Sequence, residues 1–221
     1  MNQSADIGAL THRLDLFSPD RHPAERALAL YAASITFAED GVMAKAIERG
    51  QHYGLRRSSF YEIVLQSYLF LGFPRMLTAV ETLHRLLPAN NSADGCGPIT
   101  TQESKQWFNE GSELYKKVYG PNNLRLMDRV SAMAPEVFRW MIIEGYGKVL
   151  SRPNLDIISR ELAIMAFLMM ENREKQLHSH IRGALNVGAP PELVTSVIDD
   201  IGPAAGNGYG AAKRIIGQLK T

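Results

Sequence analysis

Cysteine is almost absent from this chain of 221 residues, in which Cys96 is the only one. A single cysteine excludes a disulfide within the chain and any redox centre that needs two thiols from one chain. The sequence also lacks an H-E-x-x-H motif, paired acidic motifs and clusters of cysteine with histidine, which are common signatures of metal sites. We therefore expect neither a metal ion nor another cofactor.

Charge of one sign and long hydrophobic runs are also lacking. The 24 Lys and Arg nearly balance the 23 Asp and Glu, and no basic run is interleaved with aromatics, so we expect no nucleic-acid partner. The longest apolar run, from Leu162 to Met170, is too short to cross a bilayer, and the first 20 residues have no signal-peptide core. These observations predict a cytoplasmic protein without a membrane partner.

Strand-like alternation is scarce, whereas apolar residues recur at helical spacing in two long blocks. The sequence therefore predicts an all-α protein with helical units at residues 21–87 and 102–221. Between them, residues 88–101 gather Pro, Gly, Asn, Ser and Asp without periodicity, which predicts a linker. Residues 1–20 are expected to form a loosely held N-terminal arm.

The two blocks are related by an internal repeat. Aligning Gly188 with Gly54 shifts the chain by 134 residues (188 minus 54), and each copy then contains two helices, a glycine turn, a third helix, a glycine break and a last helix. The same offset aligns Arg160 with Arg26, Leu162 with Leu28, Ala163 with Ala29, Ala166 with Ala32, Val197 with Ile63, Ile198 with Val64 and Gly206 with Gly72. The chain is thus predicted to be internally duplicated.

The copies differ at two positions where chemistry could take place. Glu161 corresponds to Ala27, and His180 corresponds to Ala46. A function that uses these two side chains can therefore belong only to the second copy, and we predict that the first copy has no active centre.

Glu161 is expected on an apolar surface. Asp156 is a candidate N-cap for the helix that contains it, and Ile157, Met165 and Leu168 share the face of Glu161 at helical spacing. Burial of a carboxylate without partners is costly, so Glu161 should be hydrogen-bonded, paired with a cation or protonated. A carboxyl group in such surroundings is a candidate for general acid or base catalysis.

Two histidines lie on the next predicted helix, at positions 178 and 180. At ~100° per residue, His178 and His180 flank the apolar stripe on opposite edges, so they cannot both reach one small site. The helix register allows either a direct hydrogen bond or a water bridge between His180 and Glu161. The alternative is structural, in which Glu161 and His180 only hold two helices together.

These residues carry a family resemblance. From WFNEGSELYKKVYG (residues 107–120) through APEVFRWMIIEGYGKVLSRPNLDIISREL to QLHSHIRGALNVGAPPELV, the chain resembles the carboxymuconolactone decarboxylase family, whose superfamily includes AhpD-type alkylhydroperoxidases. The resemblance implies an AhpD-like helical bundle that associates with copies of itself. Two fused units mimic a homodimer, so three such chains would reproduce a ring of six units. We therefore expect a trimer of chains, with a dimer as the alternative.

The resemblance also implies a site. In the peroxidase branch, a glutamate precedes C-x-x-C-x-x-x-H, and alignment on Glu161 and His180 puts Arg173 and Gln176 at the cysteine positions. Because a thiol peroxidase needs a thiolate and Cys96 fits neither position, that activity is not expected.

The decarboxylase branch keeps the histidine without the cysteines, and it acts on a carboxylated muconolactone in the breakdown of aromatic compounds. By this resemblance, His180 would be the proton donor and Glu161 its orienting partner. Arg152 and Arg182 would bind the substrate carboxylates. We thus expect a lyase acting on a small carboxylated lactone or keto acid, or else a ligand-binding or structural relative without activity.

Overall fold

The expected all-α fold is confirmed by a computed structural model, which describes residues 5–89 and 97–219 and has no strand in those ranges. The α-helices are α1 (Ile7–Asp15), α2 (Pro23–Ile35), α3 (Asp40–His52), α4 (Arg57–Leu86), α5 (Thr101–Tyr119), α6 (Asn123–Met133), α7 (Pro135–Trp140), α8 (Ile157–Met170), α9 (Glu174–Asn186), α10 (Pro191–Ile201) and α11 (Asn207–Leu219). Two 3₁₀ turns, η1 (Gly120–Asn122) and η3 (Gly202–Ala204), and a π-helix, η2 (Met141–Leu150), complete the described chain.

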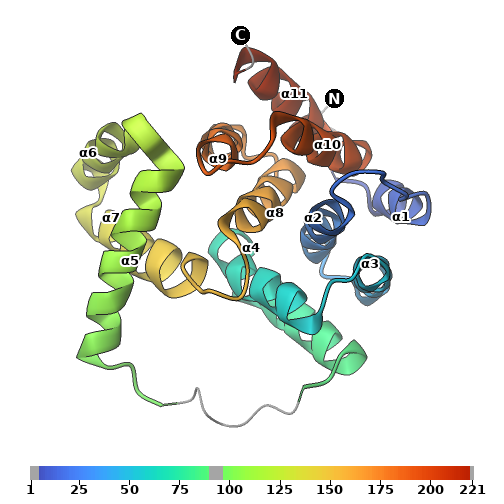
Figure 1. The fold of residues 1–221 in the computed structure, drawn as a ribbon, viewed down its shortest axis with the longest axis horizontal. Coiled ribbons are helices and arrows are strands. Elements are labelled where there is room, and N and C mark those ends of the chain that lie inside the picture. Colours follow the sequence, from blue (N-terminus) through green and yellow to red (C-terminus); the bar gives the residue numbers. More distant parts are fainter. Residues whose placement is uncertain (1–4, 90–96, 220–221) are drawn as a thin grey trace.

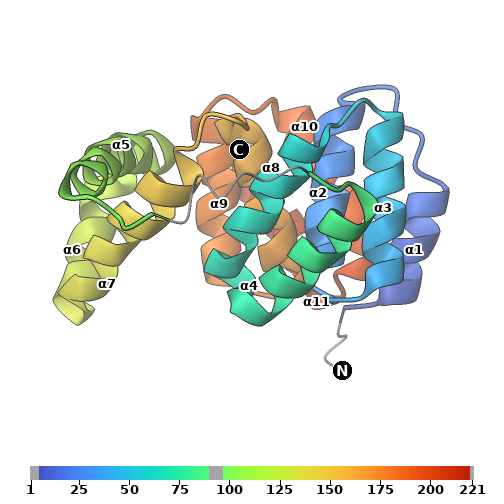
Figure 2. The same ribbon diagram turned by 90° about the horizontal axis from the view of Figure 1, so that it is seen from below.

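Helix α8 lies at the centre of the molecule, among α2, α4, α9, α10 and α11 (Figure 1). Helices α5, α6 and α7 with η1 and η2 form a separate group on one side, which we call the wing (Figures 1 and 2). The buried residues of the wing and of both repeats belong to one continuous hydrophobic core. The two repeats therefore fold together around shared apolar surface.

The helices follow the 134-residue repeat. Helices α2, α3 and α4 begin at residues 23, 40 and 57, and α8, α9 and α10 begin 134 residues later, at 157, 174 and 191. Backbone turns with positive φ recur at the same offset, at Ala38 and Asn172 (50° and 51°) and at Gly54 and Gly188 (83° and 98°). The two copies thus share the starting positions of three helices and the conformations of two turns.

Polar contacts between the copies are exchanged in the manner of a symmetric dimer. Arg26 of the first copy donates to Asp200 of the second at 2.7 and 2.9 Å. Arg160, the equivalent of Arg26, donates to Gln66, the equivalent of Asp200, at 3.4 Å. Each copy therefore supplies the arginine to one contact and the acceptor to the other, as expected for an isologous interface within one chain.

Arg160 is fully buried and depends on an acidic partner from the first copy. Its Nη2 donates to Glu62 at 2.9 Å and to the carbonyl of Arg152 at 2.9 Å. Arg152 itself donates to both carboxylate oxygens of Glu62 at 2.9 and 3.0 Å. Burial raises the pKa of Glu62, but hydrogen bonds from Arg152, Arg160 and Asn154 outweigh this effect, so the pKa lies below its ordinary value.

The N-terminal arm differs from the expectation of a loosely held segment. Residues 7–15 form α1, in which Asp6 caps the first turn by accepting from Ala9 N at 3.1 Å. Leu10 and Leu14 are fully buried, because their helical spacing gives α1 an apolar face that packs on the body. Of the predicted linker, residues 90–96 lie outside the described residues, and so does Cys96.

Helix α4 is the one described helix that is long and apolar enough to cross a membrane. It is not continuous, because Gly72 has non-helical φ and ψ angles of 79° and 166°. Each part is shorter than the ~20 residues that a membrane span requires. Phe60, Ile63 and Val64 of its first part are fully buried in the protein core, which accounts for the apolar composition there.

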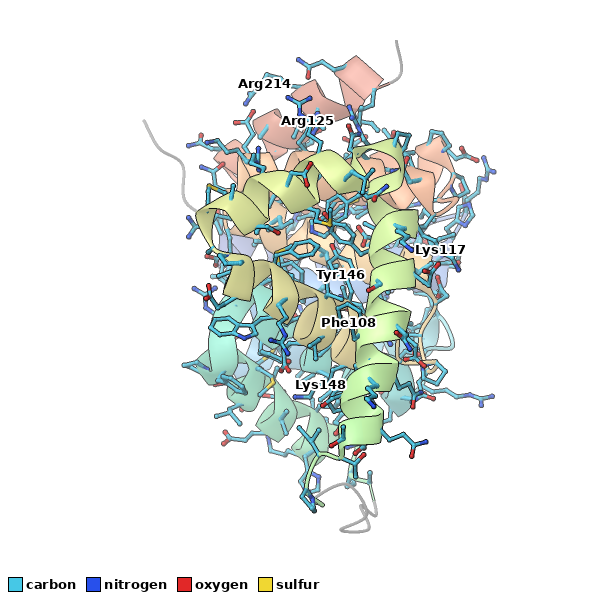
Figure 3. All side chains as sticks on the ribbon, turned by 90° about the vertical axis from the view of Figure 1, so that its left-hand side faces the viewer. Phe108, Lys117, Arg125, Tyr146, Lys148 and Arg214 are labelled. Carbon is cyan, nitrogen blue, oxygen red and sulfur yellow. The ribbon has the colours of Figure 1, made fainter. Side chains whose placement is uncertain are left out.

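The wing is held together by close packing of α5 against η2. A Cβ at Gly111 would lie 2.1 Å from the carbonyl oxygen of Ile142, and one at Gly147 would lie 2.0 Å from that of Trp107. Only glycine permits this distance between the two backbones. Figure 3 looks onto the wing, with Phe108 and Lys117 on α5 and Tyr146 of η2 in the space that the wing helices surround.

Replacement of Glu62 by Gln should destabilise the fold. The change leaves Arg160 buried without an anionic partner, for which we expect a loss of about 3 kcal/mol in the free energy of unfolding at pH 7. Because the pKa of Glu62 is lowered in the folded state, its stabilising charge is fully present above its ordinary pKa of 4.5 and is lost as the pH falls through the folded value. Urea unfolding at several pH values should therefore show a constant difference from pH 6 to 8 and a smaller one in acid.

Glu113 provides the matched control. It pairs with Lys116 at 2.8 Å, and both side chains are largely exposed. Glu113→Gln should therefore change the free energy of unfolding by less than about 0.5 kcal/mol. Equal effects of the two substitutions at pH 7 would contradict the role assigned to Glu62.

Candidate functional site

Glu161 and His180 are in direct contact. Helix α8 places Glu161 and helix α9 places His180 so that the imidazole Nδ1 lies 2.8 Å from Oε2 of the carboxylate. Glu161 is 0% exposed and His180 is 6% exposed. The structure thus has the direct bond rather than a water bridge. Since Nδ1 is used in this bond, Nε2 is the ring nitrogen that remains for another partner.

The surroundings of Glu161 leave little freedom to its carboxylate. Asp156 caps α8 as the sequence predicts, because its Oδ1 accepts from Ser159 N at 2.9 Å. Across the helix contact, a Cβ at Gly183 would lie 2.9 Å from Oε2 of Glu161, so the glycine makes room for the carboxylate on α9. Oε1 has no hydrogen-bond partner among the described residues, so the carboxylate depends on its bond to His180.

His180 lies on the wall of a mainly apolar cavity of about 400 Å³ between the body and the wing. Leu69 and Phe70 enter it from the first repeat, and the rings of Phe70 and His180 meet edge to face at 5.9 Å. The full lining consists of Leu69, Phe70, Tyr119, Val137, Trp140, Met141, Glu144, Gly145, Tyr146, Leu150, Gln176 and His180. The site is therefore built from both repeats and from the wing.

The π-helix η2 forms one wall of this cavity. Its residues Met141, Glu144, Gly145, Tyr146 and Leu150 line the space, and the pairs 141/146 and 145/150 are five positions apart, as i→i+5 winding places them on one face. Such winding is rare in proteins and occurs often at functional sites. Here it turns a row of apolar side chains and one tyrosine toward His180.

Two buried tyrosines stand next to the imidazole. Tyr146 and Tyr119 have their hydroxyl oxygens 2.9 Å apart, and the rings of Tyr119 and His180 are 6.4 Å apart. Burial raises the pKa of Tyr119 to about 12, although the bond from Tyr146 opposes this shift. Burial and the neighbouring Tyr119 also raise the pKa of Tyr146 well above its ordinary value. Both phenols are thus neutral hydrogen-bond donors at physiological pH.

The two arginines predicted to bind substrate carboxylates do not line this cavity. Arg152 is held by its bidentate bond to Glu62 on the other side of α8, and Arg182 lines a different cavity together with His178. Arg182 lies two residues from His180 on α9, so its side chain points ~160° away from that of His180. The helix register thus excludes Arg182 from the cavity at His180.

Several lining residues were not chosen as site residues from the sequence. The sequence is compatible with Trp140 and Tyr146 either lining a pocket or packing in the core, and Tyr119 has no signal beyond the family resemblance of its segment. Gln176, at one of the two cysteine positions of the peroxidase pattern, also lines the cavity. In the first repeat, the equivalents of Glu161 and His180 are Ala27 and Ala46, which are buried in the core.

Gly183→Ala tests the close contact at the carboxylate. The added methyl group would lie 2.8 Å from Val118 and 2.9 Å from Glu161, so we expect the free energy of unfolding to fall by about 1–2 kcal/mol. In Gly217→Ala on α11, where nothing lies within 4 Å of the new Cβ, the better helix propensity should instead add up to about 1 kcal/mol. Denaturant unfolding of both variants measures the contrast, and two stabilised variants would contradict the geometry described.

Comparison with known proteins gives two similar relatives, both named Peroxisomal protein 2. The relative from Saccharomyces cerevisiae is 25% identical over 164 residues, which cover 63% of this chain and 58% of the relative. The one from Schizosaccharomyces pombe is 27% identical over 142 residues, which cover 61% of this chain and 63% of the relative. The chain thus spans less than two thirds of the length of either relative.

The family comparison falls on the part of the chain that contains Glu161 and His180. Residues 135–214 match the carboxymuconolactone decarboxylase family, a stretch that extends from α7 into α11. It includes both members of the Glu161–His180 pair and the π-helix that faces them. The AhpD-like arrangement of helices agrees with this match. Over residues 135–214 the chain is therefore similar to the carboxymuconolactone decarboxylase family.

Proposed function

We propose that the protein is an enzyme of the carboxymuconolactone decarboxylase type that transfers a proton to or from a small carbonyl compound, with His180 as the acid or base. The observation that carries this proposal is the contact of His180 with Glu161 at 2.8 Å on the wall of a cavity of about 400 Å³. A histidine sealed in the core would favour a structural role. A histidine on a cavity wall, oriented by a buried carboxylate, is typical of general acid and base catalysis.

Glu161 acts in this proposal as a positioning residue. Its carboxylate accepts the hydrogen bond from Nδ1 and so leaves Nε2 toward a ligand. When Nε2 takes a proton, the adjacent carboxylate stabilises the imidazolium that forms. No serine, threonine or cysteine is among the described residues that line the cavity, so acid and base chemistry fits the site better than attack by a side-chain nucleophile.

The tyrosine pair supports chemistry at a carbonyl group. One of the two phenolic protons is used between Tyr146 and Tyr119, and the other can be donated to a ligand oxygen. Removal of a proton next to a carbonyl, or loss of CO₂ from a carboxylated lactone, leaves an enolate-like anion that needs such a donor. His180 would then deliver a proton to carbon, which completes a lyase or isomerase reaction.

The mainly apolar lining favours the uncharged ring of a substrate. Among the described residues on the cavity wall, Glu144 is the one acidic or basic side chain besides the imidazole. Arg152 and Arg182 do not line this cavity. A lactone or ketone ring therefore fits the apolar part of the cavity better than a carboxylate does. We keep a small carboxylated lactone or keto acid, as in aromatic breakdown, as the substrate class to test first.

Two other functions can be separated from this one. A thiol peroxidase is disfavoured, because Arg173 and Gln176 stand at the cysteine positions of that pattern and neither provides a thiolate. A non-catalytic, ligand-binding relative would use the same cavity without needing proton transfer by His180. The cytoplasm remains our proposed location, and the names of the two relatives make the peroxisome the alternative to test with a fluorescent fusion.

His180→Gln should abolish most of the activity while preserving the fold. Gln keeps a hydrogen-bonding side chain but cannot transfer a proton near neutral pH, so kcat should fall about 10²- to 10⁴-fold. Glu161→Gln should have a smaller effect, because Glu161 orients the ring. We would measure CO₂ release and ultraviolet absorbance change on a panel of lactones and keto acids, with a hydroperoxide and dithiol assay alongside.

His178→Gln is the matched control, since His178 lies on the same helix and lines a different cavity. It should leave the turnover rate unchanged. Equal activity of the wild-type protein and His180→Gln would contradict the catalytic role and favour ligand binding. Thiol-dependent peroxide turnover above background would favour the peroxidase branch instead.

We also propose that the chain self-associates, as a trimer or, alternatively, as a dimer. Large apolar side chains are exposed near the cavity, namely Trp140 at 63%, Phe73 at 61% and Leu77 at 53%. Phe73 stacks on Tyr68 at 5.0 Å and so is held in position. A second copy packed here would bury this apolar surface.

Light scattering at micromolar concentration should therefore report a trimer, and Phe73→Asp should shift the mass toward that of a monomer, because a charge would be buried in the contact. Leu16→Asp should leave the mass unchanged, because Leu16 is 62% exposed at the C-cap of α1, a helix on the opposite side of the body from the wing. A wild-type monomer would contradict the proposal.

A further inference from the structure

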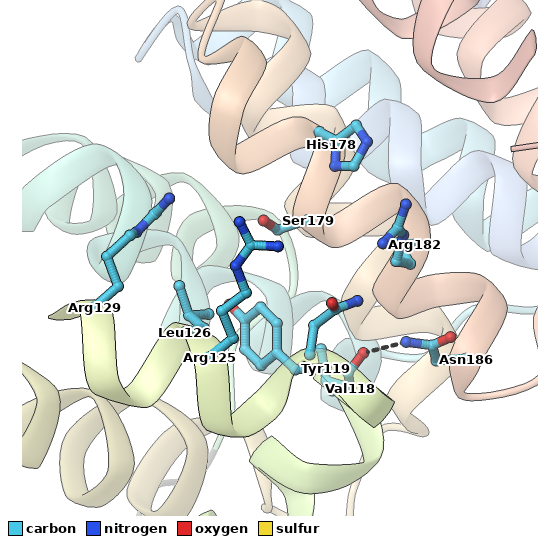
Figure 4. Close-up of a pocket in the computed structure, with 10 residues that line it drawn as sticks. Val118, Tyr119, Arg125, Leu126, Arg129, His178, Ser179, Arg182 and Asn186 are labelled. Carbon is cyan, nitrogen blue, oxygen red and sulfur yellow. Dashed lines mark hydrogen bonds between the residues drawn. The ribbon is translucent and has the colours of Figure 1, made fainter. Parts of the chain in front are cut away.

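A second cavity, of about 280 Å³, lies between α6 and α9 at the end of α5 (Figure 4). Arg125 and Arg129 project into it from α6, and Arg182 and His178 line it from α9. Tyr119 lines both this cavity and the one at His180. The two cavities thus lie on opposite sides of α9, and we call the second one the arginine pocket.

Among the described residues, the arginine pocket is lined by three arginines and by no carboxylate. No aspartate or glutamate is among its described lining residues, and Arg125, Arg129 and Arg182 form no ion pair within the described chain. This differs from the body, where Arg26, Arg152 and Arg160 are all paired with acidic residues.

The spacing of these cations is unfavourable unless an anion is present. Arg125 and Arg129 are four residues apart on α6, and His178 and Arg182 are four residues apart on α9. Arg125 and Arg129 are like charges at this spacing, so they repel each other and weaken α6. With Arg182 from α9, three guanidinium groups place several hydrogen-bond donors around a common space, which is an arrangement suited to an anionic ligand.

We propose that the arginine pocket binds the phosphate group of a small phosphorylated molecule. A phosphate monoester carries nearly two charges and three acceptor oxygens on one compact group, so a single group can meet three guanidinium ions. A single carboxylate has one charge and two oxygens. The volume of about 280 Å³ holds a phosphate with a small organic part, and Ser179 and Asn122 on the wall add neutral hydrogen-bonding groups.

This site is separate from the proposed reaction at His180. Asn186 donates to the carbonyl of Val118 at 2.8 Å and so joins α9 to the end of α5 beside the arginine pocket (Figure 4). None of the proposed phosphate ligands lines the cavity at His180. Loss of phosphate binding would therefore leave proton transfer at His180 intact, and loss of His180 would leave phosphate binding intact.

Isothermal titration of the purified full chain at constant ionic strength tests the proposal, with phenyl phosphate, inorganic phosphate and malonate as probes. We expect phenyl phosphate and inorganic phosphate to bind with a 1:1 stoichiometry and malonate to bind at least tenfold more weakly. Arg182→Gln and Arg125→Gln should each weaken phosphate binding by about tenfold or more, because each removes charge-assisted hydrogen bonds. Both side chains are at least partly exposed, so the variants should fold, which circular dichroism checks.

Arg56→Gln is the matched control. Arg56 is an exposed arginine at the start of α4 that forms no ion pair in the described chain and does not line the arginine pocket. The variant loses the same charge, so it should bind phosphate as the wild-type protein does. Unchanged affinity in Arg182→Gln, an equal loss in Arg56→Gln, or malonate binding as tight as that of phenyl phosphate would each overturn the proposal.

Discussion

Helix α8 is buried over nearly its whole length and yet carries two adjacent charged residues, Arg160 and Glu161. A buried charge is tolerated only when it is paired and hydrogen-bonded, so each residue requires a partner from another part of the chain. Arg160 finds Glu62 on α4 of the first repeat, and Glu161 finds His180 on α9. These two contacts fix α8 against α4 and α9 and so determine where the candidate site forms.

The first repeat has lost the acid and the histidine but still helps to build the site. Its helix α4 provides Glu62, which neutralises Arg160, as well as Leu69 and Phe70 on the cavity wall. This explains why a half without the Glu161–His180 pair remains in the chain. The second repeat alone would leave Arg160 buried without its anion and the cavity open on one side. The duplication therefore acts as an internal dimer in which one copy completes the candidate site of the other.

Helix α9 separates two chemically different spaces. One is mainly apolar and contains His180, whereas the other contains Arg182, His178 and the two arginines of α6. Tyr119, at the end of α5, contacts both spaces. The wing thus does more than cover apolar surface, because η2 closes the first cavity and α6 supplies cations to the second. Both cavities depend on close packing of the wing helices, for which Gly111 and Gly147 leave space.

The sequence by itself determined the helical class, the repeat of 134 residues, the cap at Asp156 and the choice of Glu161 and His180, because these depend on local periodicity, on identities along the chain and on a family pattern. The tertiary structure alone decided which residues surround the pair. Tyr119 and Phe70 are distant from His180 along the chain and yet lie beside it. Arg152 could not be assigned from the sequence, since its partner Glu62 lies 90 residues away. Long-range contacts of this kind arise from the packing of whole helices, and no local pattern in the sequence encodes them.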